Sequence, residues 1–180
     1  MGNFFRTARN PFPALCYERR GVKDVRTNAE IEHMVDEYAT MLLRVAYSQL
    51  NNRAEAEDAV QEVLLKYIEK APVFQSAEHE KAWLLRVTVN HCKNRLASAW
   101  FRKRAELDEG IPSLDGPEQE VLAAVTALPI KYRAVIHLYY FEGYSTKEIA
   151  EILHSRPNTV SSRLSRARAL LAKALKEELV

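Results

Sequence analysis

The residues between 155 and 170 are the stretch of this chain best suited to bind a polyanion. No acidic residue occurs between 155 and 176, while arginine, serine and threonine recur. Hydroxyl and guanidinium groups donate hydrogen bonds to phosphate oxygens, and arginine also reads guanine in the major groove. The side chains available for such contacts are Arg156, Asn158, Thr159, Ser161, Ser162, Arg163, Ser165, Arg166 and Arg168. We therefore predict a DNA-binding surface here, the alternative being a solvated basic helix.

A second basic stretch covers residues 81–104. It holds seven Lys or Arg residues and no acidic residue, interleaved with asparagine and aromatic residues. Aromatic rings stack on unpaired bases, asparagine bonds base edges, and cations neutralise phosphates. The predicted contact residues are Trp83, Arg86, Asn90, Lys93, Asn94 and Arg95. The pattern favours nucleic acid with one strand accessible, although Trp83 and Trp100, each taken singly, fit a core position at least as well.

The residue types required for catalysis do not occur in a recognisable arrangement. The five histidines have no metal-ligand spacing with one another or with the two cysteines. There is no glycine-rich phosphate loop. We therefore expect a protein that is not an enzyme and that uses no metal and no cofactor, with Cys92 and His137 as packed helix residues. Two widely separated cysteines also suggest a reducing, cytoplasmic setting.

Helical periodicity positions the second basic stretch within the first half of the chain. Thr27 followed by Glu30 is a capping box, and the helix that it opens ends before Asn51. Asn52 caps a second helix, which ends before Pro72 because proline disfavours helical backbone at the preceding residue. A loop at 72–79 and a third helix over about 80–104 complete this half.

Proline and glycine residues mark the boundaries of the predicted helices in the second half of the chain. Residues 105–117 read as an acidic linker, and Pro117 opens a helix that Pro129 interrupts. The next helix is expected over 130–142 and ends at Gly143. Two short helices then follow, separated by a break at 154–156, and form a helix-turn-helix.

The predicted fold is all-α, with two small helical domains joined by the acidic linker. Residues 1–29 are expected to be a poorly ordered basic extension, 30–104 the first domain, 105–117 the linker and 118–180 the second domain. The blocks alternate in charge: residues 30–80 hold eleven acidic and four basic residues, directly before the basic stretch 81–104. No apolar run approaches the roughly 18 residues that span a bilayer, so membrane insertion is not expected.

Three motifs, in the right order along the chain, resemble a known family. Residues 58–63 (DAVQEV) resemble region 2.2 of bacterial RNA polymerase sigma factors of the sigma-70 family, and residues 83–90 (WLLRVTVN) with 93–95 (KNR) resemble regions 2.3 and 2.4. Residues 128–129, 143–145, 148–150 and 159–168 resemble region 4. A short chain holding only these two domains is similar to the extracytoplasmic-function (ECF) subfamily, over about residues 30–175.

The resemblance implies a division of labour among these surfaces. Asp58, Gln61 and Glu62 would bind the β′ clamp helices of core RNA polymerase, and the β flap would be a further contact. The loop 72–79 and the helix from Trp83 would capture flipped bases of the −10 promoter element. The helix-turn-helix would read the −35 element, the acidic linker would thread polymerase channels, and an anti-sigma factor is a further partner known in the family.

This sequence departs from the family pattern in two places, and other functional classes remain open. Many relatives carry a basic residue where Ser161 stands and an aromatic or large residue near Ser165, so we expect the −35 contacts to be weaker or to differ in sequence preference. The first 29 residues have no counterpart in the family core. The main alternative is a helix-turn-helix regulator that acts without polymerase, and a pure protein-binding adaptor is the third. The second basic, aromatic-rich helix argues against the regulator, and the composition of the recognition helix makes the adaptor the least favoured of the three.

Overall fold

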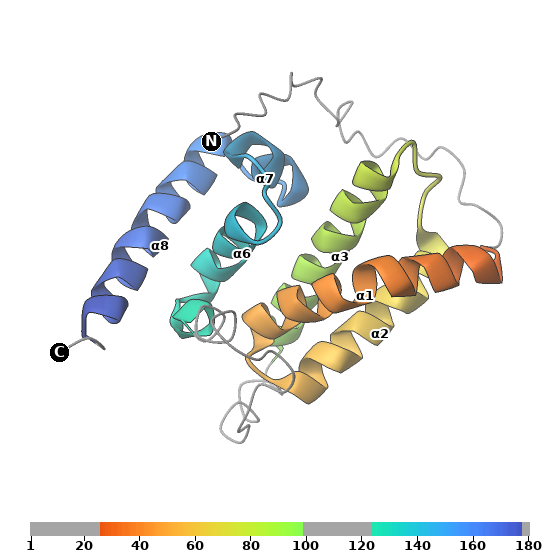
Figure 1. Ribbon diagram of the computed structural model, residues 1–180, viewed down its shortest axis with the longest axis horizontal. Helices are drawn as coiled ribbons and strands as arrows, with labels where there is room; N and C mark the ends of the chain where they lie inside the picture. The colour runs from red at the N-terminus through yellow and green to blue at the C-terminus, as the bar shows by residue number, and fades with distance from the viewer. Residues whose placement is uncertain (1–25, 99–123, 178–180) are drawn as a thin grey trace, which may run out of the picture.

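The computed structural model describes residues 26–98 and 124–177, and the elements there are α-helices. The first group contains α1 (Asn28–Leu50), α2 (Arg53–Lys70) and α3 (Ala77–Ala97). The second contains α6 (Ile130–Tyr140), α7 (Thr146–Ile152) and α8 (Pro157–Glu177). The two groups lie side by side, with α8 on the outer side (Figure 1). The all-α prediction is confirmed.

The first group forms where local capping signals predict helices. Thr27 and Glu30 make the predicted capping box of α1, and the Asn52 side chain accepts a hydrogen bond from the backbone N–H of Glu55 at the start of α2. Asn51 adopts left-handed backbone and separates the two helices. Apolar residues at helical spacing then pack α1, α2 and α3 around a common core. Its buried members include Met34, Leu42, Val63, Tyr67 and Leu84.

The boundaries of this group differ from the predicted ones. Helix α3 begins at Ala77, not near residue 80, because the Ser76 side chain caps it by accepting from the His79 N–H. It ends at Ala97, short of the expected residue 104, because Ser98 has extended backbone. Residues 26–29 belong to the folded group rather than to an extension, since α1 begins at Asn28 and Arg26 is buried. The predictions on residues 1–25, Trp100, the linker 105–117 and Pro117 lie outside the described residues.

The second group contains the predicted helix-turn-helix. Ser145 and Glu148 form a capping box that opens α7, and Pro157 opens α8 after a turn in which His154 has a φ of 46°. Helix α6 ends at Tyr140, two residues earlier than expected, because the N–H groups of Phe141 and Glu142 both donate to the His137 carbonyl. The chain then turns through Gly143, whose φ of 74° suits a residue without Cβ.

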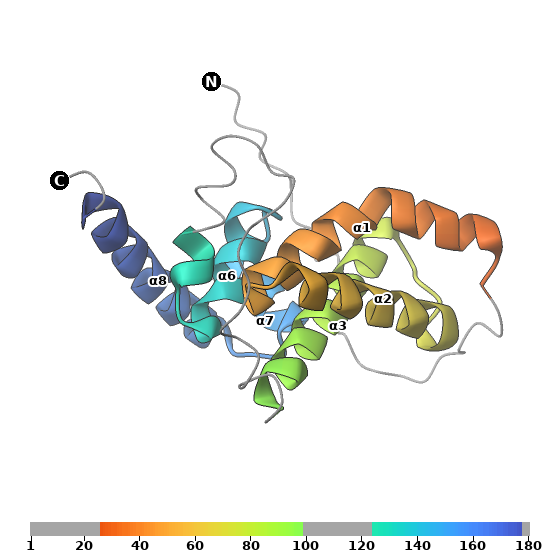
Figure 2. The same cartoon turned by 90° about the horizontal axis from the view of Figure 1, so that it is seen from below.

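The two groups share one apolar core. Val45, Leu85 and Val89 from the first group join Leu128 and Val135 from the second in a single cluster. Helix α6 packs against α1, and α7 against α3; the view in Figure 2 also shows α6 and α7 beside these helices. Arg133 of α6 donates to the Gln49 carbonyl at 2.8 Å, in the last turn of α1. The described helices include none that is long and apolar enough to span a membrane.

Candidate nucleic-acid and polymerase interface

The predicted DNA-reading face lies on the first turns of α8. Val160, Leu164 and Ala167 are buried against the rest of the domain, so residues on the opposite side of the helix face solvent. The predicted residues that are exposed there are Arg156, Asn158, Ser161, Ser162, Ser165, Arg166 and Arg168, while Thr159 and Arg163 are half-buried at the flanks. Helix α8 thus presents hydroxyl, amide and guanidinium groups on one continuous surface.

Part of this face lines a hollow between α8 and α6. The hollow has a volume of about 320 Å³. Its lining residues are Lys131, Tyr132, Asn158, Thr159, Ser162, Arg163 and Arg166. Three of them are cationic, so the hollow attracts anionic groups. Lys131 was missed at the sequence level because it belongs to no motif, and only the packing of α6 against α8 brings it to the recognition helix.

Arg168 has a different environment from the other predicted residues of α8. Its Nε donates to the Tyr140 hydroxyl at 2.8 Å. The guanidinium also lies 5.1 Å from the ring centroid of Tyr139 and 5.6 Å from that of Tyr140, distances at which a cation is attracted to an aromatic face. Arg168 therefore connects α8 to α6 rather than extending freely from the surface.

On α3 the structure divides the six predicted −10 residues into two sets. Asn90, Lys93 and Asn94 are exposed. Their spacing of three and four residues places them on one helix face. This face offers two amides and one ammonium group to a ligand. The amides can form hydrogen bonds with base edges, and the ammonium group can neutralise a phosphate.

The other three predicted residues are engaged within the protein. Trp83 is only 6% exposed and packs edge-to-face against Phe74 at 5.8 Å between ring centroids. Its ring therefore lies in the core of this structure, which is the alternative that the sequence left open for Trp83. Arg86 is 8% exposed, and its Nη1 lies 3.3 Å from His154 Nε2, in the turn of the helix-turn-helix.

Arg95 joins α3 to the acidic helix α2. Its Nε donates to Glu55 and its Nη2 donates to Asp58 Oδ2 at 3.1 Å. Burial lowers the pKa of Arg95, but the hydrogen bonds and charges of Glu55 and Asp58 outweigh this effect and raise the pKa above its ordinary value. The predicted −10 residue Arg95 and the predicted polymerase-binding residue Asp58 are therefore partners in one ion-pair cluster.

The predicted polymerase-binding face lies on the solvent side of α2. Asp58, Gln61 and Glu62 are all exposed, because Ala59, Val63 and Tyr67 form the buried stripe of this helix. The three residues share one face at helical spacing. Asp58 is the member that also contacts Arg95. A polar, net acidic surface of this kind fits a basic protein partner.

The described residues contain no group of three or more His, Cys, Asp and Glu side chains arranged to hold a metal ion. Cys92 is fully buried, and burial raises its pKa to about 12. A thiol with this pKa stays protonated and is a poor nucleophile. His137 is also fully buried and stacks on Phe141 at 4.7 Å. Both residues have the packing role that the sequence predicts.

Comparisons with known proteins match both groups of helices. Residues 34–102 match the family described as Sigma-70 region 2, and residues 118–171 match Sigma-70, region 4. The solved structures that are similar include the sigma factor RpoE of Bartonella quintana in complex with the anti-sigma factor NepR. It has a TM-score of 0.60 and 23% identity over 82% of this chain and 97% of that one. CnrH in complex with the cytosolic domain of CnrY also has a TM-score of 0.60, at 21% identity over 84% and 90% of the two chains.

Curated relatives are similar over nearly their full length. The ECF RNA polymerase sigma factor SigM of Mycobacterium tuberculosis (strain ATCC 35801 / TMC 107 / Erdman) is 33% identical over 172 residues, which cover 86% of this chain and 88% of SigM. RNA polymerase sigma factor SigV of Bacillus subtilis (strain 168) is 29% identical over 87% of this chain and 97% of SigV. These matches do not favour a regulator that acts apart from polymerase. The chain belongs to the ECF sigma factors of the sigma-70 family.

Proposed function

We propose that this protein binds core RNA polymerase in the cytoplasm and directs it to promoters by reading two DNA elements, without being itself an enzyme. The observation that carries the proposal is the presence of two separate exposed faces suited to nucleic acid on one chain. One is the arginine- and serine-rich face of α8, and the other is the Asn90, Lys93 and Asn94 face of α3. An ordinary repressor needs only the first of these.

The α8 face would enter the major groove at the −35 element. Arg166 has the exposure needed to read a base edge. Lys131 and Arg163, which flank the same hollow, would contact the phosphate backbone. Ser161 and Ser165 are exposed on this face but carry no charge, so the base preference would depend on Asn158 and Arg166 more than on them.

The α3 face would act at the −10 element, where the strands separate. Asn90 and Asn94 would bond the edges of unpaired bases, and Lys93 would neutralise a phosphate. The exposed loop before α3 would help to capture a flipped base. Arg86 would join this face only after leaving His154, so full −10 contact would require the two domains to move apart.

The remaining predicted partners are proteins. The acidic face with Asp58, Gln61 and Glu62 would dock on the β′ clamp helices of core polymerase, and the second domain would meet the β flap. One of the similar solved structures, RpoE of Bartonella quintana, is in complex with the anti-sigma factor NepR. An anti-sigma protein is therefore a further proposed partner of this chain.

The experiment is run-off transcription with purified core polymerase on two templates of one promoter, one fully duplex and one mismatched across the −10 region. Asn90→Ala should reduce transcription from the duplex and should be partly rescued by the mismatched template, because melting is then not required. Glu32→Ala, at an exposed position of α1, is the matched control and should transcribe both templates normally. A protein that binds a palindromic site tightly by itself, yet never supports initiation, would refute the proposal.

A further inference from the structure

Arg26 precedes Thr27, the N-cap of α1, and lies outside the segment matched to Sigma-70 region 2, yet its side chain is only 5% exposed. A buried charge is unfavourable unless it is paired and hydrogen-bonded. Its Nη2 donates to the Pro72 carbonyl at 2.8 Å and its Nε to the Tyr67 carbonyl at 3.3 Å. The guanidinium thus holds the last turn of α2 and the loop that follows.

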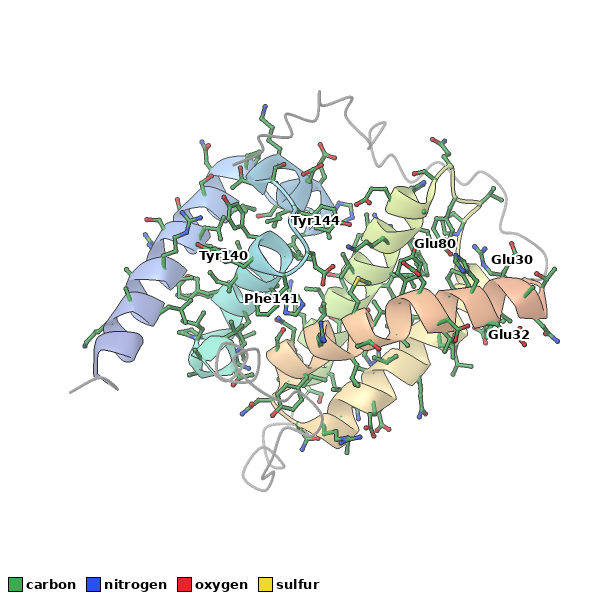
Figure 3. All side chains as sticks on the ribbon, in the orientation of Figure 1. Glu30, Glu32, Glu80, Tyr140, Phe141 and Tyr144 are labelled. Atoms are coloured by element: carbon green, nitrogen blue, oxygen red, sulfur yellow. The ribbon has the colours of Figure 1, made fainter. Side chains whose placement is uncertain are left out.

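The same guanidinium sits on an aromatic cluster. It lies 4.2 Å from the Tyr67 ring centroid and 5.0 Å from that of Phe74, and these two rings stack at 6.1 Å. The Tyr67 hydroxyl donates to Glu80 in the first turn of α3. Burial and this hydrogen bond raise the pKa of Tyr67, so that its hydroxyl stays a donor. Glu80 and Glu30, which is 3.8 Å from Arg26 Nη1, lie toward the same end of the first group (Figure 3).

These contacts fix the loop between α2 and α3. Residues 71–76 leave the helix at Ala71, whose backbone is extended, and Phe74 packs inward against Trp83. Val73 is 58% exposed and Gln75 is exposed, so these two side chains point away from the cluster. Arg26 bonds the loop at one residue and lies over the ring of another. Arg26 therefore contributes to the alternation of inward and outward side chains, together with Trp83, which packs on Phe74.

We propose that Arg26 is a positioning residue for promoter opening. It holds loop 71–76 in the conformation that presents Val73 and Gln75 to a base flipped out of the −10 element. This inference rests on the proposed function, because it assigns the loop a role in −10 capture. A preformed loop captures a base more readily, because it loses little conformational entropy at the moment of binding. Arg26 would thereby contribute to promoter opening without contacting the DNA itself.

The test compares Arg26→Ala and Arg26→Lys with Lys70→Ala. Lys70 is an exposed cation in the last turn of the same helix α2, so its removal controls for the loss of positive charge beside the loop. Opening is measured by permanganate reactivity of −10 thymines on a duplex promoter, with transcription from the mismatched template, binding to core polymerase and thermal unfolding measured in parallel. Arg26→Ala should open the duplex about tenfold less than wild type, because two hydrogen bonds from a charged donor are lost.

Arg26→Ala should bind core polymerase normally and recover on the mismatched template, and Lys70→Ala should match wild type throughout. Arg26→Lys retains the charge over the rings but lacks the planar fork, so its opening should be intermediate. If Arg26→Ala fails to fold, Arg26→Lys decides: opening equal to wild type overturns the inference. An equal loss on both templates shows a role in the fold only and also overturns it. A wild-type protein that is inactive on both templates instead refutes the proposed function.

Discussion

Lys81 of α3 and Glu142 of the second group form an ion pair that joins the two domains. Lys81 Nζ lies 2.9 Å from Glu142 Oε2, and the side chains are 27% and 10% exposed. Lys81 Nζ also lies 5.7 Å from the ring centroid of Tyr144, which is located where the chain turns from α6 to α7 (Figure 3). One lysine of the second basic stretch thus serves the domain contact and not the DNA face.

Replacing Lys81 by Met should weaken the contact between the domains. It removes the partner of a largely buried carboxylate, and we expect a loss of about 1–2 kcal/mol in the free energy of unfolding. The particle should also become larger in solution as the domains separate. Urea denaturation and small-angle X-ray scattering measure the two effects. Lys93→Met, at an exposed site of the same helix, should change neither, and an unchanged scattering profile for Lys81→Met would contradict the prediction.

Acid should weaken the same contact through Glu142. Burial would raise the pKa of Glu142, but the ion pair with Lys81 and the nearby His137, whose Nε2 lies 3.7 Å from the carboxylate, outweigh this and hold the pKa below the ordinary value of 4.5. Because the folded-state pKa is the lower one, the stabilisation is fully present above pH 4.5 and is lost as the pH falls through the folded-state pKa. The efficiency of energy transfer between dyes on the two domains should therefore decrease at pH values below 4.5. In Glu142→Gln this component of the pH dependence should disappear.

Charge reversal on the solvent face of α2 should impair polymerase binding without affecting the fold. Glu62 is exposed, so Glu62→Lys should leave thermal unfolding unchanged and weaken binding to core polymerase by roughly tenfold through like-charge repulsion. Competition against a labelled sigma factor measures this affinity. Glu32→Lys, an equal charge change on α1, is the control. Asp58→Lys is a less clean variant, since it places a second cation beside Arg95, and normal competition by Glu62→Lys would exclude this face.

Two arginines of α8 should behave differently at the −35 element. Arg166 lines the hollow beside Lys131, and Arg166→Ala should cost about 1–3 kcal/mol of discrimination at one base pair if it reads a base edge. Arg168 is bonded to Tyr140, so Arg168→Ala should leave base discrimination unchanged. Binding of holoenzyme to a set of single-base −35 variants separates the two results. Equal effects of both substitutions would contradict the assignment.

Local signals in the sequence determined most of the helices. The capping boxes at Thr27 and Ser145, the Asn52 cap and the opening Pro157 all act within a few residues of their own backbone, so their effects are readable from the chain alone. The start of α3, which was predicted three residues too late, also has a local signal. Ser76 was a readable cap, but the weak periodicity of that stretch concealed it.

Which polar residues remain available for function was decided only by the tertiary structure. Asn90 and Arg86 look equally suitable in the sequence, yet Arg86 meets His154, a residue 68 positions away, while Asn90 is exposed. Arg26 and Lys131 belong to no motif, and packing alone brings one to loop 71–76 and the other to α8. Helical periodicity reports which side of a helix is apolar, but the partner of each charged side chain depends on how distant helices pack, and that information is not local.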